Sequence, residues 1–176
     1  MIELVVGGAR SGKSRYAEQK MLDTGKQCIY LATAESLDEE MERRIETHRG
    51  RRAGVWLTVE EPLYLGRALQ GTDAPDRCIL VECLTLWISN LLKAGPGVSV
   101  QEQKQALLAV LPGLTADVCL VSNEVGWGIV PLGELSRRYV DEAGWLHQEL
   151  ARICDRVTLV VAGLPWTLKD RAPGTG

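Results

Sequence analysis

The chain has 176 residues, of which 45% are hydrophobic and 24% charged, and its formal net charge is −3 at pH 7. A chain of this length can bury a sizeable core, and we expect residues 1–176 to form one domain. The mildly acidic charge argues against binding to nucleic acid or to a membrane surface as the main activity.

The five cysteines are odd in number and form no C-x-x-C pair, and four of them lie in apolar runs. We therefore expect buried, reduced thiols, as suits the reducing cytosol. The first residues enter an apolar run directly and lack the charged segment of a signal peptide. No apolar run approaches the roughly 18 residues of a membrane-spanning helix. These features predict a cytoplasmic protein without a membrane span.

Mostly apolar runs predict strands over residues 2–6, 27–33, 77–83, 118–123 and 157–163. The runs are nearly continuous rather than alternating, which is typical of strands that are covered on both faces. Residues 55–61 predict a further short strand or one arm of a hairpin.

Helical patterns between these runs cover residues 13–24, 37–49, 84–93, 101–111 and 132–154. The alternation of strands and helices predicts an α/β fold with a mostly parallel sheet and right-handed crossovers. Residues 93–99 read as a loop, and residues 170–176 as a frayed tail.

A phosphate-binding motif follows the first strand. Gly7, four further residues and then Gly12, Lys13 and Ser14 form the pattern GxxxxGK[ST], placed between a strand and an amphipathic helix. Glycines let backbone N–H groups approach phosphate oxygens, and the helix N-terminus adds the positive end of its dipole. Lys13 can reach the β- and γ-phosphates, and the Ser14 hydroxyl can bind Mg²⁺. The motif predicts a nucleoside triphosphate site with Mg²⁺.

An acidic residue ends a later strand. Glu82 lies at the carboxyl end of the run over residues 77–83, the edge at which open α/β sheets bind ligands. A carboxylate there is costly unless a cation or metal accompanies it. We expect Glu82 to act at the Mg²⁺ or ligand site, with helix capping or an ion pair as the alternative.

One of the two histidines lies in a basic stretch. On a helical wheel His48 falls on the same side as the apolar Leu37, Met41 and Ile45, and four arginines surround it in the sequence. Neighbouring positive charge disfavours the imidazolium form, so a neutral, nucleophilic imidazole is expected. The alternative is a solvated basic turn. The other histidine, His147, is expected at the surface or at an interface.

The chain resembles the bifunctional adenosylcobinamide kinase/adenosylcobinamide-phosphate guanylyltransferase family of cobalamin biosynthesis. The resemblance covers nearly the whole chain. It rests on GGARSGKSRYAE, YLATAESLDEEMERRIETHRGRR, W-x-T-x-E ending at Glu60, LVECLTLWISNLL, SNEVGWGIVP and VVAGLPWTLK, in that order. The first motif is common to many proteins, and its combination with RIETHR and SNEVGWGIVP is specific. The stretch over residues 93–113 diverges from the family.

The resemblance implies two reactions. A nucleoside triphosphate, GTP or ATP, phosphorylates the aminopropanol hydroxyl of adenosylcobinamide. GTP then guanylylates a histidine with release of pyrophosphate, and the GMP passes to adenosylcobinamide phosphate to give adenosylcobinamide-GDP. The resemblance also implies a P-loop α/β fold like the RecA core and a homotrimer with active sites between subunits.

The family's functional positions match residues of this chain. The guanylylated histidine matches His48, and Lys13 acts on the phosphates. Ser14 and Glu82 are the expected Mg²⁺ ligands. The GTP contacts match Gly7, Gly8, Ala9, Arg10, Ser11, Gly12, Lys13, Ser14, Thr33, Ala34, Glu35, Arg49, Gly50, Arg51, Arg52, Glu60 and Glu82.

Chemistry suggests a role for each group. The arginines and Lys13 can stabilise the leaving pyrophosphate, Thr33 to Glu35 suit ribose or base contacts, and Glu60 can accept hydrogen bonds from guanine. Asn123 and Glu124 are expected to shape the corrinoid side, and no residue stands out as the general base of the kinase step.

Three other functions compete with this one. A P-loop small-molecule kinase would leave His48 with a structural role. A regulatory GTPase is disfavoured because no NKxD-like tetrapeptide follows a late strand. A nucleic-acid ATPase is disfavoured by the net charge and the single basic cluster.

Overall fold

The computed structural model describes residues 1–34 and 55–171, and these form a seven-stranded sheet with order β3-β2-β4-β5-β1-β6-β7. The strands are β1 (Ile2–Gly7), β2 (Gln27–Ala32), β3 (Trp56–Glu60), β4 (Arg77–Glu82), β5 (Asp117–Asn123), β6 (Arg156–Val161) and β7 (Leu164–Asp170). Neighbouring strands are parallel except β6 and β7, which form an antiparallel hairpin at one edge. The carboxyl ends of β1 to β6 therefore all lie at the same end of the sheet.

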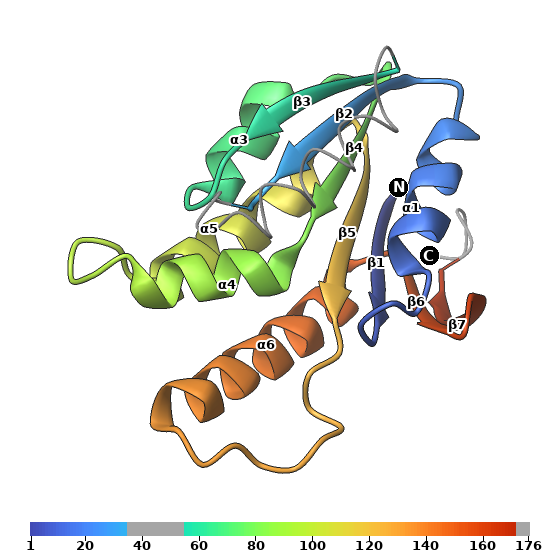
Figure 1. Cartoon of the computed structure of the whole chain (residues 1–176). Coiled ribbons are helices and arrows are strands. Elements are labelled where there is room, and N and C mark those ends of the chain that lie inside the picture. Colours follow the sequence, from blue (N-terminus) through green and yellow to red (C-terminus); the bar gives the residue numbers. More distant parts are fainter. Residues whose placement is uncertain (35–54, 172–176) are drawn as a thin grey trace.

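Helices cover both faces of the sheet, as Figure 1 shows. Helix α1 (Lys13–Leu22) packs on one face, and the larger group packs on the other. That group contains α3 (Leu65–Thr72), α4 (Leu84–Lys93), α5 (Val100–Val110) and α6 (Glu134–Ile153), and a 3₁₀ turn (Leu111–Gly113) follows α5.

Strand β4 illustrates why the strand sequences are continuously apolar. Ile79 and Val81 belong to the core beneath α3 to α6, whereas Cys78 and Leu80 belong to the core beneath α1. All four side chains are fully buried. Because successive residues of a strand point to opposite faces, a strand covered on both sides needs apolar residues at every position. The prediction of a mostly parallel sheet is confirmed.

The five strands expected from the apolar runs are all present, within two residues at either end. Residues 55–61 contain β3, which pairs in parallel with β2 and so is not a hairpin arm. The helix expected over residues 37–49 lies outside the described residues. All five cysteines are buried and free, as expected. Within the described ranges, no helix has the length and apolar character needed to cross a membrane.

Two elements were not expected from the sequence. Helix α3 contains Gly66 and Gly71, which read as helix breakers. Gly66 is required by packing, because a Cβ there would lie 3.1 Å from the Ala106 backbone of α5. Strand β7 begins within the terminal VVAGLPWTLK motif and ends at Asp170, the first residue of the expected frayed tail.

Candidate functional site

The phosphate-binding motif forms the loop between β1 and α1. Gly7 is the last residue of β1, Lys13 is the first residue of α1, and the Ser11 N–H donates to the Gly8 carbonyl (3.2 Å). Arg10 and Gly12 have positive φ angles of 57° and 95°. Residues other than glycine rarely adopt the backbone conformation of Gly12. The loop thus wraps in front of the α1 N-terminus, where the helix dipole attracts anions.

The turn between β6 and β7 supports this loop. The Gly163 N–H donates to the Ser11 carbonyl (2.7 Å). A Cβ on Gly12 would lie 3.1 Å from the Gly163 Cα, and a Cβ on Gly7 would lie 2.5 Å from the Val160 carbonyl oxygen. Gly7 is therefore required by close packing, and Gly12 by close packing as well as by its positive φ angle. The terminal motif VVAGLPWTLK therefore supports the phosphate loop through the packing of Val160 and through the packing and hydrogen bond of Gly163.

Lys13 lies inside the loop that it follows. Its side chain is 8% exposed, and Nζ donates to the Gly8 carbonyl (3.2 Å). Burial lowers the pKa of Lys13, while the nearby Cys83 and Glu82 oppose that shift. Within residues 1–34 and 55–171 this buried ammonium has a single hydrogen-bond acceptor, which leaves donor capacity for an anion such as phosphate.

Ser14 and Glu82 are brought together as expected. The Ser14 hydroxyl donates to Glu82 Oε1, and the Tyr30 hydroxyl donates to Oε2 (3.2 Å). Glu82 ends β4 and is joined to Cys83 by a cis peptide bond. The capping alternative for Glu82 is not supported, because Cys83 is the N-cap of α4 and no side chain caps that helix. Glu82 therefore faces the phosphate loop.

The two facing oxygen groups fit a magnesium ion. Hydroxyl and carboxylate oxygens are the ligands that Mg²⁺ prefers, and it commonly takes only one or two from protein when phosphates supply others. Among the described residues there is no group of three or more His, Cys, Asp or Glu side chains placed to hold a metal. This sparse ligand set suits an ion that arrives with a nucleotide.

Thr33 follows β2 beside this pair, but its hydroxyl is already engaged. The side chain is fully buried, and Oγ1 donates to the Cys83 carbonyl (2.8 Å). The Thr33 carbonyl accepts from Asn90 Nδ2 (2.7 Å). Thr33 thus couples the ends of β2 and β4, and a nucleotide contact from its hydroxyl stays a prediction. The half-buried Ala34 follows it.

Other predicted nucleotide contacts lie farther along the chain or outside the described residues. Glu60 is exposed at the carboxyl end of β3, with β2 between it and β4. The remaining predicted positions are Glu35, His48, Arg49, Gly50, Arg51 and Arg52, which lie outside the described residues.

The end of β5 adjoins the phosphate loop on its other side. Asn123 pairs with Gly7, and the Glu124 N–H donates to the Gly7 carbonyl (3.0 Å). Asn123 Nδ2 also donates to Thr85 Oγ1 (3.0 Å) in the first turn of α4. Asn123 and Glu124 therefore lie beside the phosphate loop, and their expected role on the corrinoid side stays a prediction.

His147, expected at the surface or at an interface, is partly covered within the chain itself. It is half-buried on α6, and Nε2 lies 2.6 Å from the hydroxyl of Ser122 on β5. Burial lowers the pKa of His147, and the nearby Glu124 opposes the shift. The helical pattern of the sequence could have predicted this burial, because His147 follows the buried Leu146 on the helix face that meets the sheet.

Comparison with known proteins places this geometry in context. The family model described as cobinamide kinase / cobinamide phosphate guanyltransferase matches residues 3–168. The bifunctional adenosylcobalamin biosynthesis protein CobP of Pseudomonas aeruginosa is 54% identical over 169 residues, covering 96% of this chain and 98% of that protein. The corresponding CobU protein of Salmonella typhimurium is 40% identical over 182 residues, covering 96% of this chain and all of that protein.

Similar solved structures bear on the fold alone. The RadB recombinase has a TM-score of 0.50 at 17% identity, covering 90% of this chain and 73% of its own. A protein from Pyrococcus horikoshii has a TM-score of 0.54 at 7% identity, covering 98% of this chain and 87% of its own. The expected fold, a mostly parallel α/β sheet of the RecA-like P-loop type, is confirmed.

Proposed function

Because the chain belongs to the cobinamide kinase / cobinamide phosphate guanyltransferase family, we propose that both of its reactions use one phosphate loop and that His48 carries the nucleotidyl group. The chain is a bifunctional kinase and guanylyltransferase of cobalamin biosynthesis. The observation that carries the proposal is the loop at Gly7 to Ser14, in which Lys13 is buried and Ser14 is hydrogen-bonded to Glu82.

In the kinase reaction, the loop holds the triphosphate while the hydroxyl of adenosylcobinamide attacks the γ-phosphorus. A P–O bond forms to the acceptor, and the bond to the leaving nucleoside diphosphate breaks. Lys13 and the N-terminus of α1 stabilise the charge that develops on the phosphate oxygens. GTP and ATP both carry the triphosphate that this loop recognises.

In the guanylyl transfer, a His48 ring nitrogen attacks the α-phosphorus of GTP and pyrophosphate leaves. A P–N bond forms and a P–O bond breaks. The phosphate of adenosylcobinamide phosphate then attacks the same phosphorus, so that GMP passes to it and the imidazole is released. A covalent intermediate divides one difficult transfer into two easier ones. Arg49, Arg51 and Arg52 suit stabilisation of the pyrophosphate charge.

Ser14 and Glu82 are the residues that would hold Mg²⁺. The ion, when bound, neutralises phosphate charge and orients the phosphate oxygens. Tyr30 fixes the Glu82 carboxylate through Oε2, which leaves Oε1 directed at Ser14. For the nucleoside, Thr33 to Glu35 are proposed to lie near the ribose or base, and Glu60 to accept hydrogen bonds from guanine.

We also propose that the chain works in the cytoplasm as a homotrimer. Free, buried cysteines suit a reducing compartment. On β7, which is one of the two edge strands, alternate residues Leu164, Trp166 and Leu168 are between 53% and 72% exposed. An apolar face of this kind favours contact with another copy. Sedimentation at three times the mass of one chain would support the trimer, and a monomer at micromolar concentration would overturn it.

The test of the nucleophile uses GTP labelled with ³²P at the α-phosphorus. We expect acid-labile label on the wild-type protein and none on His48→Ala, which keeps some kinase activity. The matched control is His147→Ala, because the chain has only two histidines. Label that persists in His48→Ala would contradict the assignment. Kinase activity without any label on the wild type would favour the alternative, a small-molecule kinase without guanylyl transfer.

A further inference from the structure

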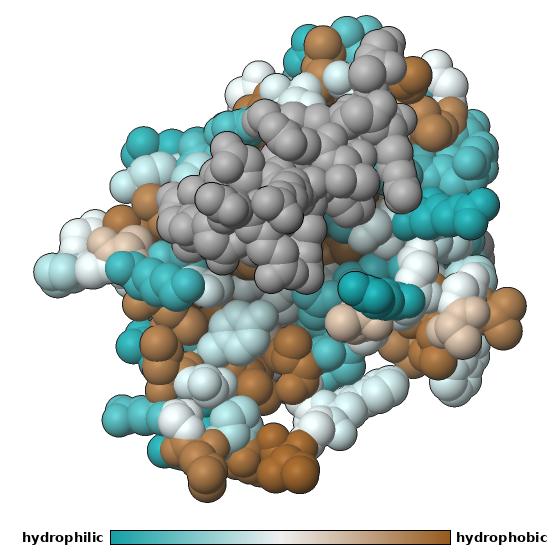
Figure 2. Space-filling view, viewed as in Figure 1, coloured by the Kyte–Doolittle hydropathy of each residue, from teal (hydrophilic) through white to brown (hydrophobic). Residues whose placement is uncertain are grey.

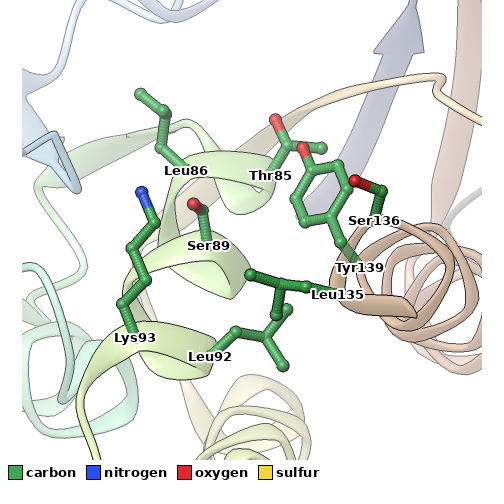
Figure 3. A pocket seen from close by; sticks show the side chains of 8 residues that line it. All are labelled: Thr85, Leu86, Ser89, Leu92, Lys93, Leu135, Ser136 and Tyr139. Carbon is green, nitrogen blue, oxygen red and sulfur yellow. The ribbon is translucent and has the colours of Figure 1, made fainter. Parts of the chain in front are cut away.

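A cleft of about 250 Å³ lies between α4 and α6. Figure 3 shows that its walls combine hydroxyl groups with aliphatic side chains. The hydroxyls belong to Thr85, Ser89, Ser136 and Tyr139, and leucines and Lys93 complete the lining. This mixture differs from a hydrophobic core, and it suits a small ligand group with both alkyl and hydrogen-bonding parts.

The inner end of the cleft is connected to the phosphate site. Thr85 Oγ1 accepts from Asn123 Nδ2 (3.0 Å) and lies 3.1 Å from the Cys83 thiol. Asn123 pairs with Gly7 of the phosphate loop, and Cys83 directly follows Glu82. A ligand group that reaches Thr85 is therefore next to the residues that surround the triphosphate.

Tyr139 extends this connection along the cleft. Figure 3 shows its hydroxyl directed toward Thr85. Burial raises the pKa of Tyr139, with the hydrogen bond from Thr85 opposing the shift. The phenol consequently stays protonated at neutral pH, where it can donate a hydrogen bond as well as accept one.

The outer end of the cleft adjoins an exposed apolar segment. Between β5 and α6, Trp127 is 76% exposed, and Ile129 and Leu132 are each 97% exposed. Leu135, at the start of α6, continues this segment into the cleft wall. Figure 2 shows hydrophobic side chains gathered at the lower end of the molecule, over this segment and the start of α6. Apolar side chains exposed together in this way mark a binding surface.

We propose that the cleft between α4 and α6 binds the aminopropanol arm of adenosylcobinamide, and that the apolar segment at residues 127–132 contacts the macrocycle. The inference rests on the proposed function and adds the location of the acceptor. The cleft is large enough for a short amide-linked alcohol but not for a corrin ring. Its hydroxyls match the amide and alcohol of the arm, and its inner end brings the reacting hydroxyl toward the phosphate loop.

The test fills the cleft from each wall. Ser89→Leu and Ser136→Leu place a branched side chain in it, and Tyr139→Phe removes one hydroxyl. The matched control is Gln148→Leu, an exposed α6 position that does not line the cleft. Binding of adenosylcobinamide is measured by equilibrium dialysis with detection of corrin absorbance. GTP binding and α-³²P labelling without acceptor serve as measures of an intact fold and phosphate loop.

We expect both leucine variants to weaken adenosylcobinamide binding by about 10-fold or more, and Tyr139→Phe by about 3- to 10-fold. GTP binding and labelling should stay within about twofold of wild type, as should all properties of Gln148→Leu. Wild-type affinity for adenosylcobinamide in both leucine variants would overturn this inference alone. Failure of the wild-type protein to bind adenosylcobinamide would overturn the proposed function together with it.

Discussion

The hydroxyl of Ser14 donates a hydrogen bond to the carboxylate of Glu82, although 68 residues separate them in the sequence. Ser14 belongs to the first turn of α1, and Glu82 ends β4, which is separated from β1 by β5. The parallel sheet brings the two groups together because Glu82 is at the carboxyl end of β4 and Ser14 belongs to the helix that follows the carboxyl end of β1. This contact joins the phosphate loop to the proposed Mg²⁺ site.

Glu82→Gln should impair the kinase reaction through the metal. The amide keeps the shape of the side chain but removes the negative charge, so we expect apparent Mg²⁺ affinity to fall by about 10- to 100-fold. The measurement is the kinase rate as a function of Mg²⁺ concentration. Tyr30→Phe, which removes the hydrogen bond to Oε2, should have a smaller effect in the same direction. An unchanged Mg²⁺ dependence in Glu82→Gln would rule out its role as a ligand.

Lys13→Ala should reduce both reactions, because both place a triphosphate in the same loop. Loss of a buried cation that stabilises transition-state charge is expected to lower each rate by about 100-fold or more. Transfer from γ-³²P-GTP reports the kinase step, and protein labelling from α-³²P-GTP reports the first guanylyl step. Lys26→Ala is the matched control, since Lys26 pairs with Asp117 away from the loop. Normal kinase activity in Lys13→Ala would show that the loop does not hold the phosphoryl donor.

His147 should make the protein less stable in mild acid. Burial lowers the pKa of this histidine from 6.5 in the folded state, so the unfolded chain binds the proton more readily. The stabilising contribution is therefore complete above pH 6.5 and is lost as the pH falls below it. Chemical unfolding between pH 5 and 8 measures the effect. His147→Gln should reduce the dependence of the free energy of unfolding on pH in this range. The same dependence as in wild type would show that His147 does not cause the loss of stability.

The cysteines should resist thiol reagents while the protein is folded. All five are buried, and burial raises the pKa of Cys28 and Cys154 to about 12. Because the thiolate is the reactive form, we expect almost no reaction with a disulfide reagent at pH 8 in the native protein. All five thiols should react after unfolding in denaturant. Rapid reaction of one or more thiols in the native protein would show that part of the core opens readily.

The parts of the structure that local patterns encode were predictable. Both faces of β4 are buried, so its apolar run identified a central strand, and Glu82 at its end was recognised as a ligand candidate. Tyr30 was not recognised as the partner of Glu82, because only the register of β2 against β4 brings them together. Helix α3 was missed because Gly66 lowers helix propensity, while its close packing on α5 depends on contacts distant in sequence. The cleft between α4 and α6 also depends on tertiary packing.

Guanylyl transfer through His48 requires a chemically competent guanylyl-enzyme. Wild-type protein labelled with α-³²P-GTP is freed of nucleotide and mixed with adenosylcobinamide phosphate in a single turnover. We predict that the label leaves the protein and appears in adenosylcobinamide-GDP as fast as the enzyme turns over. Label that stays on the protein, or leaves only as free GMP, would contradict the account.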